Sequence, residues 1–363
     1  MEKPIRVLHV VTYMGRGGLE TMLMNYYRNI DRDIVQFDFL VHRSFEAEYD
    51  AEILKMGGHI YHLPTLNPFS ISYHKKLNAF FKEHSYDVVH SHLDCMSAYP
   101  LAYAKKYGAS VRIAHAHNKN QDHNFKYIVK SISRRFMPQY ATHLFACSEE
   151  AGKWMFGKHQ FYVLNNAIDA KRYRFSADRA EREKKALNIS NEFVIGHIGR
   201  FYPQKNHKFL IEIFRELVKI ESDAKLFLVG TGPDRELIRE KVKEYHLENK
   251  VVFMGSREDI PEILQAIDVF VFPSLYEGLG IAAVEAQAAG IPCILSDQVP
   301  VECRMTQNVE FLSLKKSPKC WAESIIKYKN RVHLDNYTEI CKSGYDIKEN
   351  AKKLQMFYQN GSY

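Results

Sequence analysis

The chain has 363 residues, of which 46% are hydrophobic and 26% charged, and its formal net charge is +7. No apolar run approaches the roughly 18 residues of a membrane-spanning helix, and no repeat or low-complexity tract occurs, which excludes a membrane-embedded or repeat architecture. The length suits two globular domains. The first residues, MEKPIRV, lead directly into a strand instead of a signal peptide, so we expect a soluble, cytoplasmic protein.

Cysteine usage and charge narrow the expected partners. The six cysteines show no CxxC spacing, which favours neither a zinc site nor a disulfide framework. Residues 1–172 carry 22 Lys and Arg against 16 Asp and Glu, together with 13 of the 17 histidines. This bias fits an anionic partner, such as a membrane surface or a phosphorylated substrate, and it fits simple solubility equally well. No nucleic-acid partner is expected.

Short apolar strands alternate with longer amphipathic helices along the whole chain. Clear helical spacing of apolar residues occurs in segments 205–221 and 233–247. In chain order, the predicted strands are residues 5–12, 35–42, 59–64, 87–92, 111–117, 143–148, 161–165, 193–199, 224–230, 250–255, 269–274 and 291–296.

This alternation predicts the α/β class, with parallel sheets covered by helices on both faces. The rhythm restarts near Phe193, after a highly charged helix at residues 177–189. We therefore predict two doubly wound, Rossmann-like domains, residues 1–172 and 173–343, that face each other across a cleft. Ligands of such sheets bind at the carboxyl ends of the strands, so the loops there are the candidate sites.

The first such loop is rich in glycine. Gly15, Gly17 and Gly18 precede a predicted helix, and exposed backbone amides at a helix start suit an anion. Because Gly17 and Gly18 are adjacent, the spacing does not match the dinucleotide fingerprint, and a nicotinamide cofactor is not expected. A purely structural glycine turn is the alternative.

Two pairs of histidines end later strands of the first domain. His90 and His92 follow one strand, and His115 and His117 follow the next, where the period of two places each pair on one side. Most strand histidines are structural. A pair can also bind metal, but no Asp or Glu stands at a convincing spacing to complete a site, so we predict no metal.

In the second domain, three strand-end loops carry candidate residues. Arg200 and Lys205 flank a turn in IGRFYPQKN, where two cations can clamp a diphosphate, although a solvated surface explains either residue alone. Gly230 and Gly232 form a turn before a helix. The backbone around Arg257 can read a nucleobase, and an ordinary loop is the equally good alternative.

The segment YEGLGIAAVEAQAAGIPC, residues 276–293, joins a glycine turn to a helix. Glu285 has only apolar neighbours three and four residues away, so its carboxylate must lie in a packed or pocket-lining stripe. A carboxylate there requires hydrogen-bond donors, since an unpaired buried charge costs several kcal/mol. Sugar or ribose hydroxyls would serve as donors.

Taken together, the motifs resemble those of the family 4 retaining glycosyltransferases of the GT-B architecture, especially bacterial enzymes of capsular and exopolysaccharide synthesis. The resemblance covers nearly the entire chain. Its marks are the EX7E motif from Glu277 to Glu285, together with GRFYPQKN, GRGGLET, VVHSH, RIAHAHN and VLNNAID.

The resemblance implies roles for these residues. Glu277 would lie against the donor sugar and Glu285 would bind the ribose hydroxyls. The turn and helix start at Gly278, Leu279 and Gly280 would face the sugar or diphosphate.

Further roles follow from the same likeness. Arg200 and Lys205 would stabilise the departing diphosphate, with no metal or other cofactor required, and Gly17 and Gly18 would approach the phosphates. A histidine near the sugar is expected at His117, with His115 as the alternative.

The resemblance also implies the partners and the last helix. The donor would be a nucleotide sugar, with UDP as the expected nucleotide, and the acceptor a glycan or a polyprenyl-linked saccharide. The final helix, about residues 344–363, would cross back onto the first domain. From its own residues, the basic amphipathic segment 125–140 is expected either to rest on an anionic membrane surface or to pack with a solvated basic face, and the two alternatives fit equally well.

Two other classes compete with this interpretation. A sugar-nucleotide epimerase of similar architecture would convert a donor without an acceptor, which the EX7E spacing disfavours. A transferase-like scaffold without activity would be expected to lose Glu277, Arg200 or Lys205, and all three are present.

Overall fold

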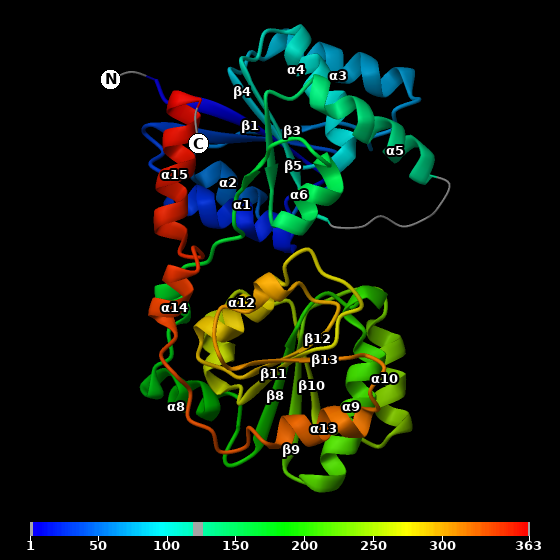
Figure 1. The fold of residues 1–363 in the computed structure, drawn as a ribbon, viewed down its shortest axis with the longest axis vertical. Coiled ribbons are helices and arrows are strands. Elements are labelled where there is room, and N and C mark those ends of the chain that lie inside the picture. Colours follow the sequence, from blue (N-terminus) through cyan, green and yellow to red (C-terminus); the bar gives the residue numbers. More distant parts are fainter. Residues whose placement is uncertain (1–2, 119–125, 362–363) are drawn as a thin grey trace. The chain divides into compact units, whose positions relative to one another are not determined.

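The structure, a computed structural model, describes residues 3–118 and 126–361 (Figure 1). The chain divides into two compact units. Unit 1 comprises Met1–Ile168 and Asp346–Tyr363, and unit 2 comprises Asp169–Tyr345. The sequence placed the boundary near residue 172. Among the described residues, no helix combines the length and apolar character needed to cross a bilayer.

Unit 1 is built on a seven-stranded sheet in the order β3-β2-β1-β4-β5-β6-β7, in which every strand pairs in parallel with its neighbours. Its strands are β1 (Ile5–Val11), β2 (Val35–Val41), β3 (Ile60–His62), β4 (Val88–Ser91), β5 (Val111–Ala116), β6 (His143–Ala146) and β7 (Tyr162–Val163). Its helices are α1 (Gly18–Asn29), α2 (Asp50–Lys55), α3 (Ile71–Glu83), η1 (Asp94–Ser97), α4 (Ala98–Lys106), α5 (Lys126–Phe136), η2 (Met137–Gln139), α6 (Glu149–Phe156) and α15 (Ile347–Asn360).

The sheet of unit 1 is buried on both faces. All seven residues of β2 are buried, as expected for a parallel strand between two helical layers. The last helix, α15, belongs to this unit because the backbone N–H of Ile347 donates to the Ile168 carbonyl, and Leu354 and Phe357 join the same apolar core as β1. Figure 1 shows α15 alongside α1 and β1, far from it in sequence.

Unit 2 contains a six-stranded parallel sheet in the order β10-β9-β8-β11-β12-β13. Its strands are β8 (Phe193–Ile198), β9 (Ala224–Val229), β10 (Val251–Gly255), β11 (Val269–Phe272), β12 (Cys293–Ser296) and β13 (Val309–Leu312). Its helices are α7 (Ala170–Tyr173), α8 (Ala177–Ala186), η3 (Pro203–Lys205), α9 (His207–Ile220), α10 (Arg235–Glu244), α11 (Ile260–Ile263), η4 (Leu264–Ala266), α12 (Ile281–Ala288), η5 (Val301–Cys303), α13 (Pro318–Ile326) and α14 (Tyr337–Lys342).

The strand order reverses once in each sheet, between β1 and β4 in unit 1 and between β8 and β11 in unit 2. In doubly wound sheets this reversal opens a crevice at the carboxyl ends of the strands, where ligands bind. The predicted α/β class with two doubly wound parallel sheets is therefore confirmed. The strand-end loops of β1, β4, β8 and β11 are the places to look for a site.

Candidate active site

The most tightly built polar contact at the reversal in unit 2 joins Lys205 and Glu277. Lys205 Nζ lies 2.6 Å from Glu277 Oε1, and only 17% and 7% of the two side chains are exposed. The ammonium also lies 4.5 Å from the centroid of the Phe272 ring. A cation held by a carboxylate and an aromatic face is fixed in position.

Hydrogen bonds tie together the two loops that carry this pair. Leu275 N donates to the Gln204 carbonyl at 2.8 Å, and Gln204 Nε2 donates to the Tyr276 carbonyl at 2.9 Å. Asn206 has a left-handed backbone (φ 54°), and its side chain donates to the Pro273 carbonyl. The loops after β8 and β11 therefore act as one rigid element.

Arg200 lies on the same turn as Lys205 but in a different environment. It is exposed, and its guanidinium lies 5.3 Å from the centroid of the Tyr202 ring. Lys205 is thus oriented by its partners, whereas Arg200 stays accessible to an anion.

The glycine turn after β9 holds the Arg200 loop from the other side. Gly230 and Gly232 have φ angles of 140° and 155°. A Cβ on Gly230 would lie 2.2 Å from the Gly199 carbonyl oxygen, and one on Gly232 would lie 2.5 Å from the Phe201 carbonyl oxygen. Only glycine permits both this conformation and this approach of two backbones.

Helix α12 begins directly after the Glu277 loop. Gly280, at φ 90°, precedes its first residue, and no side chain caps this end. The Ala283 N–H already donates to the Gly280 carbonyl, so the N–H groups of Ile281 and Ala282 are those that an anion would meet. Leu279 is buried, while Gly278 is half-buried at the start of the turn.

Glu285 is buried on α12 and has a partner that the sequence did not identify. The Tyr173 hydroxyl, at the end of α7, donates to Glu285 Oε1 at 2.7 Å. Burial raises the pKa of Glu285 to about 7, although the Tyr173 hydrogen bond and the charge of Arg172 both act to lower it. The carboxylate is thus balanced between its charged and neutral forms near neutral pH.

Arg257 follows β10 and is paired with a carboxylate. Its Nε donates to Asp259 Oδ1 at 2.8 Å, and this ion pair raises the pKa of Arg257. The guanidinium is therefore engaged within its own loop.

In unit 1, the predicted glycine loop begins helix α1. Gly17 is its N-cap residue and, as a glycine, supplies no side-chain cap hydrogen bond. A Cβ on Gly17 would lie 2.2 Å from Glu20 Oε2, so the Glu20 side chain already lies over this turn. The carboxylate is a local neighbour that the sequence pattern did not indicate.

Five histidines on β1, β4 and β5 or directly after these strands form two hydrogen-bonded rows across the sheet of unit 1. In the first row, His9 Nδ1 lies 3.0 Å from His92 Nε2, and His92 Nδ1 lies 3.0 Å from His117 Nε2.

The second row runs beside the first. The Tyr358 hydroxyl lies 2.8 Å from His90 Nδ1, and His90 Nε2 lies 3.1 Å from His115 Nδ1. The ring centroids of His115 and His117 lie 4.1 Å apart with the ring planes tilted by 33°, as expected from their shared side of the sheet.

Burial keeps these imidazoles neutral. It lowers the pKa of His9 and His117 to about 3, and it lowers those of His90, His92 and His115 well below their ordinary value.

His117 is half-buried, and its backbone N–H donates to Asp94 Oδ1 at 2.8 Å. The sequence did not indicate His9 or Asp94. His9 reaches the row because β1 pairs with β4, and Asp94 reaches the His117 backbone from the turn after β4.

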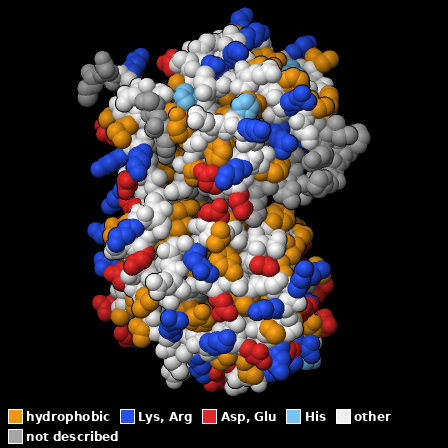
Figure 2. All heavy atoms as spheres, viewed as in Figure 1, with side chains coloured by type: hydrophobic (Ala, Val, Ile, Leu, Met, Phe, Trp, Pro, Cys, Tyr) orange, Lys and Arg blue, Asp and Glu red, His pale blue; other side chains and the backbone are white. Residues whose placement is uncertain are grey.

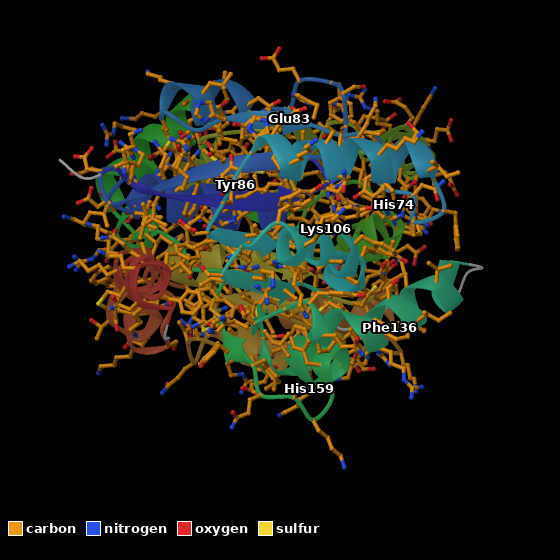
Figure 3. The ribbon with its side chains drawn as sticks, turned by 90° about the horizontal axis from the view of Figure 1, so that it is seen from above. His74, Glu83, Tyr86, Lys106, Phe136 and His159 are labelled. Carbon is orange, nitrogen blue, oxygen red and sulfur yellow. The ribbon has the colours of Figure 1, made fainter. Side chains whose placement is uncertain are left out.

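The predicted basic segment 125–140 lies partly outside the described residues, since residues 119–125 are not described. Within α5, Arg134 Nη1 donates to the Trp154 carbonyl and its guanidinium lies 5.4 Å from the Trp154 ring centroid. Arg135 is exposed next to Phe136, which is 47% exposed and is labelled in Figure 3. Arg134 is thus packed, whereas Arg135 faces solvent.

The fold and these strand-end loops define a GT-B glycosyltransferase, and comparisons with known proteins agree. Two family models match, Glycosyltransferase Family 4 over residues 16–172 and Glycosyl transferases group 1 over residues 178–353. The EpsF protein of Bacillus subtilis is 36% identical over 369 residues, covering 97% of this chain and 96% of EpsF. The chain therefore belongs to glycosyltransferase family 4, as its motifs predicted.

Two further comparisons cover nearly the full length. The capsular polysaccharide biosynthesis glycosyltransferase CapH of Staphylococcus aureus is 24% identical, over 98% of this chain and 99% of CapH. The crystal structure of Anabaena HepE in complex with UDP-glucose superposes with a TM-score of 0.81 at 17% identity, covering 98% of this chain and 99% of HepE. The structural likeness confirms the predicted GT-B fold.

Proposed function

We propose that this glycosyltransferase transfers a hexose or N-acetylhexosamine from a UDP-sugar, with retention of configuration, to a glycan or polyprenyl-linked saccharide in exopolysaccharide or capsule synthesis. The observation that carries the proposal is the Lys205–Glu277 pair, which lies at the reversal of the unit 2 sheet and beside the uncapped start of α12. The likeness to CapH supports the pathway, and the UDP-glucose complex of HepE supports the donor class.

The cations supply the main catalytic effect. As the bond from the anomeric carbon to the diphosphate breaks, negative charge accumulates on the leaving nucleoside diphosphate. Lys205, already fixed by Glu277, and the exposed Arg200 would stabilise that charge without reorganisation. Fixed cations of this kind replace a metal ion in the proposed mechanism.

The donor is held around these cations. Glu277 would lie against the sugar, and the backbone at Gly278, Leu279 and Gly280 would face the sugar or diphosphate. Glu285 would accept hydrogen bonds from the ribose hydroxyls, in part replacing the Tyr173 hydroxyl. Backbone groups beside Arg257 would read the base, because its side chain is already paired with Asp259.

From unit 1, the proposed donor contacts are His117 and the turn at Gly17 and Gly18. His117 is favoured over His115 because it is half-buried, whereas His115 is 1% exposed. Asp94 is engaged with this histidine: Oδ1 accepts from the His117 backbone N–H, and Oδ2 from the Asn118 side chain. It therefore serves to position His117.

Retention is proposed to follow a same-face substitution. The bond between the anomeric carbon and the diphosphate oxygen breaks, and the bond to the acceptor oxygen forms on the same face. The acceptor proton passes to the departing diphosphate. An inverted anomeric centre in the isolated product would contradict this mechanism.

Because the proposed acceptor is linked to a lipid, the enzyme is proposed to contact an anionic membrane peripherally, on its cytoplasmic side. Ile132 and Phe136 are 55% and 47% exposed on α5, next to the exposed Arg135. Over the face drawn in Figure 2, basic and acidic side chains are interspersed, so a local apolar and basic contact is favoured over a broad positive surface.

Liposome flotation tests this contact. The double variant Arg135→Glu/Phe136→Ser should lose binding to anionic vesicles. Lys158→Glu, an exposed charge reversal outside α5, is the control. Equal flotation of the double variant and the wild type would rule the contact out.

The proposed function is tested by a thermal-shift panel of UDP, GDP, ADP, CMP and their sugar conjugates on wild type and Lys205→Ala. A nucleotide at about 100 times its dissociation constant adds roughly 2.7 kcal/mol of stability. We expect UDP and one UDP-sugar to stabilise the wild type, and the substitution to remove the effect. Conversion of the donor without acceptor would indicate an epimerase, and absence of all nucleotide binding would indicate a scaffold.

A further inference from the structure

The two histidine rows of unit 1 bring together enough nitrogen ligands to hold a metal ion. Among the described residues, two overlapping groups qualify: His9, His90 and His92 form one, and His92, His115 and His117 form the other. Within each group, one ring nitrogen from each residue lies within 4.8 Å of the others. The sequence predicted no metal, because neither pair of histidines had an Asp or Glu at a suitable spacing to complete a metal site. The structure completes each group with a histidine from a neighbouring strand.

The second group is better prepared for a ligand than the first. His117, at the end of β5, is half-buried, so this group reaches the edge of the protein interior. His115 Nε2 is buried and has no hydrogen-bond partner among the described residues, as is also true of His9 Nε2 in the first group, so access through His117 is what distinguishes the second group. A buried nitrogen without a partner is unfavourable, and a bound ion would satisfy it.

Each inner ring of this group is also held from behind. His115 is fixed through its Nδ1 by His90 Nε2 at 3.1 Å, which leaves its Nε2 as the ligand atom. His92 is fixed through its Nε2 by His9 Nδ1 at 3.0 Å, which leaves its Nδ1 facing His117 Nε2. Metal-binding histidines are typically held in this way through the second ring nitrogen, which sets the orientation and tautomer of the ring.

We propose that His92, His115 and His117 bind one divalent cation of the zinc class, with His9 and His90 orienting the ligands. An all-imidazole set selects late first-row metals such as zinc, cobalt and nickel over magnesium and calcium, which require oxygen ligands. Three protein ligands leave a fourth position open for water or for a hydroxyl group.

The protons balance when the ion binds. In the metal-free protein, one proton is shared between His92 Nδ1 and His117 Nε2, which are 3.0 Å apart. Coordination uses the lone pairs of both nitrogens, so this proton moves to Nδ1 of His117. His92 keeps its proton on Nε2, toward His9, and His115 keeps its proton on Nδ1, toward His90, so every ligand remains a neutral imidazole.

Metal binding by the purified full-length chain tests the site, in the absence of any nucleotide sugar. The protein is first dialysed against a chelator, then titrated with Co²⁺ while its visible absorption is followed, and finally with Zn²⁺ in competition. Bound metal is counted by mass spectrometry. We expect one ion per chain, a visible spectrum typical of four-coordinate cobalt, its displacement by Zn²⁺, and no displacement by Mg²⁺.

Variants locate the site. His92→Gln and His115→Gln should each weaken Zn²⁺ binding at least ~100-fold, and His90→Gln, which removes an orienting contact, roughly 10–100-fold. His159→Gln is the matched control, because His159, labelled in Figure 3, is exposed on the loop between α6 and β7 and belongs to neither histidine group. It should bind as the wild type does.

The outcomes separate cleanly. A wild type that binds no Zn²⁺, or His92→Gln and His115→Gln variants that keep full affinity, would overturn the proposal. Where those variants fail to fold, as judged by circular dichroism, X-ray absorption on the zinc-loaded wild type decides. Three imidazole ligands support the site, and fewer than three overturn it. Because nucleotide binding is measured separately, failure of this site leaves the proposed function untouched.

Discussion

The polar centres of the two units use opposite electrostatic strategies. In unit 2, Lys205 and Glu277 form a mostly buried ion pair. In unit 1, four buried histidines and the half-buried His117 are neutral rings that hydrogen-bond one another. A buried ion pair depends on both partners, since removing one leaves an uncompensated charge. A row of neutral imidazoles loses only a hydrogen bond when one contact is removed.

The largest effect should follow from breaking the ion pair. Lys205→Met leaves the Glu277 carboxylate buried without its cation, so we expect a loss of roughly 3–5 kcal/mol in the free energy of unfolding. Chemical denaturation measures it. The double variant Lys205→Met/Glu277→Gln should recover much of that loss, and a double variant no more stable than Lys205→Met would argue against a coupled pair.

Arg200→Ala tests whether a positive charge can matter for catalysis without contributing to the stability of the fold. Because Arg200 is exposed, its removal should leave the unfolding transition unchanged. Transfer should nevertheless slow roughly 10²–10³-fold in kcat, as for loss of one preorganised group that stabilises the transition state. Initial rates with saturating donor test this, and Arg215→Ala is the control, because Arg215 is an exposed arginine of α9 that lies over the Tyr245 ring. An unchanged kcat would remove Arg200 from the mechanism.

Glu285 gives a pH-dependent contrast within unit 2. Its folded pKa of about 7 exceeds the ordinary value of 4.5, so between these values the folded chain holds a proton that the unfolded chain has released. The free energy of unfolding should therefore fall as the pH rises from 4.5 to 7.

Glu285→Gln removes that titration. The free energy of unfolding of the variant minus that of the wild type should rise by roughly 2–3 kcal/mol between pH 4.5 and pH 8. The variant should also bind UDP more weakly. Denaturation at both pH values measures this, with the exposed Glu339→Gln as control. A stability difference that does not depend on pH would contradict the raised pKa.

The smallest effect is expected in the histidine rows. Tyr358→Phe removes the hydroxyl that contacts His90 Nδ1, a bond between neutral groups, so the free energy of unfolding should fall by about 1 kcal/mol. Near-ultraviolet circular dichroism combined with denaturation measures it. A loss as large as that of Lys205→Met would show that the rows are charged and would end the contrast between the units.

The sequence predicted the sheets and the strand-end loops because these depend on local periodicity and turn residues. The turn before α9 and the glycine turn before α12 lie at the positions that their turn residues predicted. The partners of the candidate site depend instead on register and on distant packing. Tyr173 reaches Glu285 from α7, and His9 reaches His92 because β1 lies next to β4. No spacing within one segment records such a contact.

The position of α15 has a consequence for folding during synthesis. This helix supplies Leu354, Phe357 and Tyr358 to the core of unit 1, yet the ribosome makes it after the whole of unit 2. Unit 2 therefore has all of its residues before unit 1 does. The first segment synthesised must wait, with part of its apolar core uncovered, until the last helix emerges to close it.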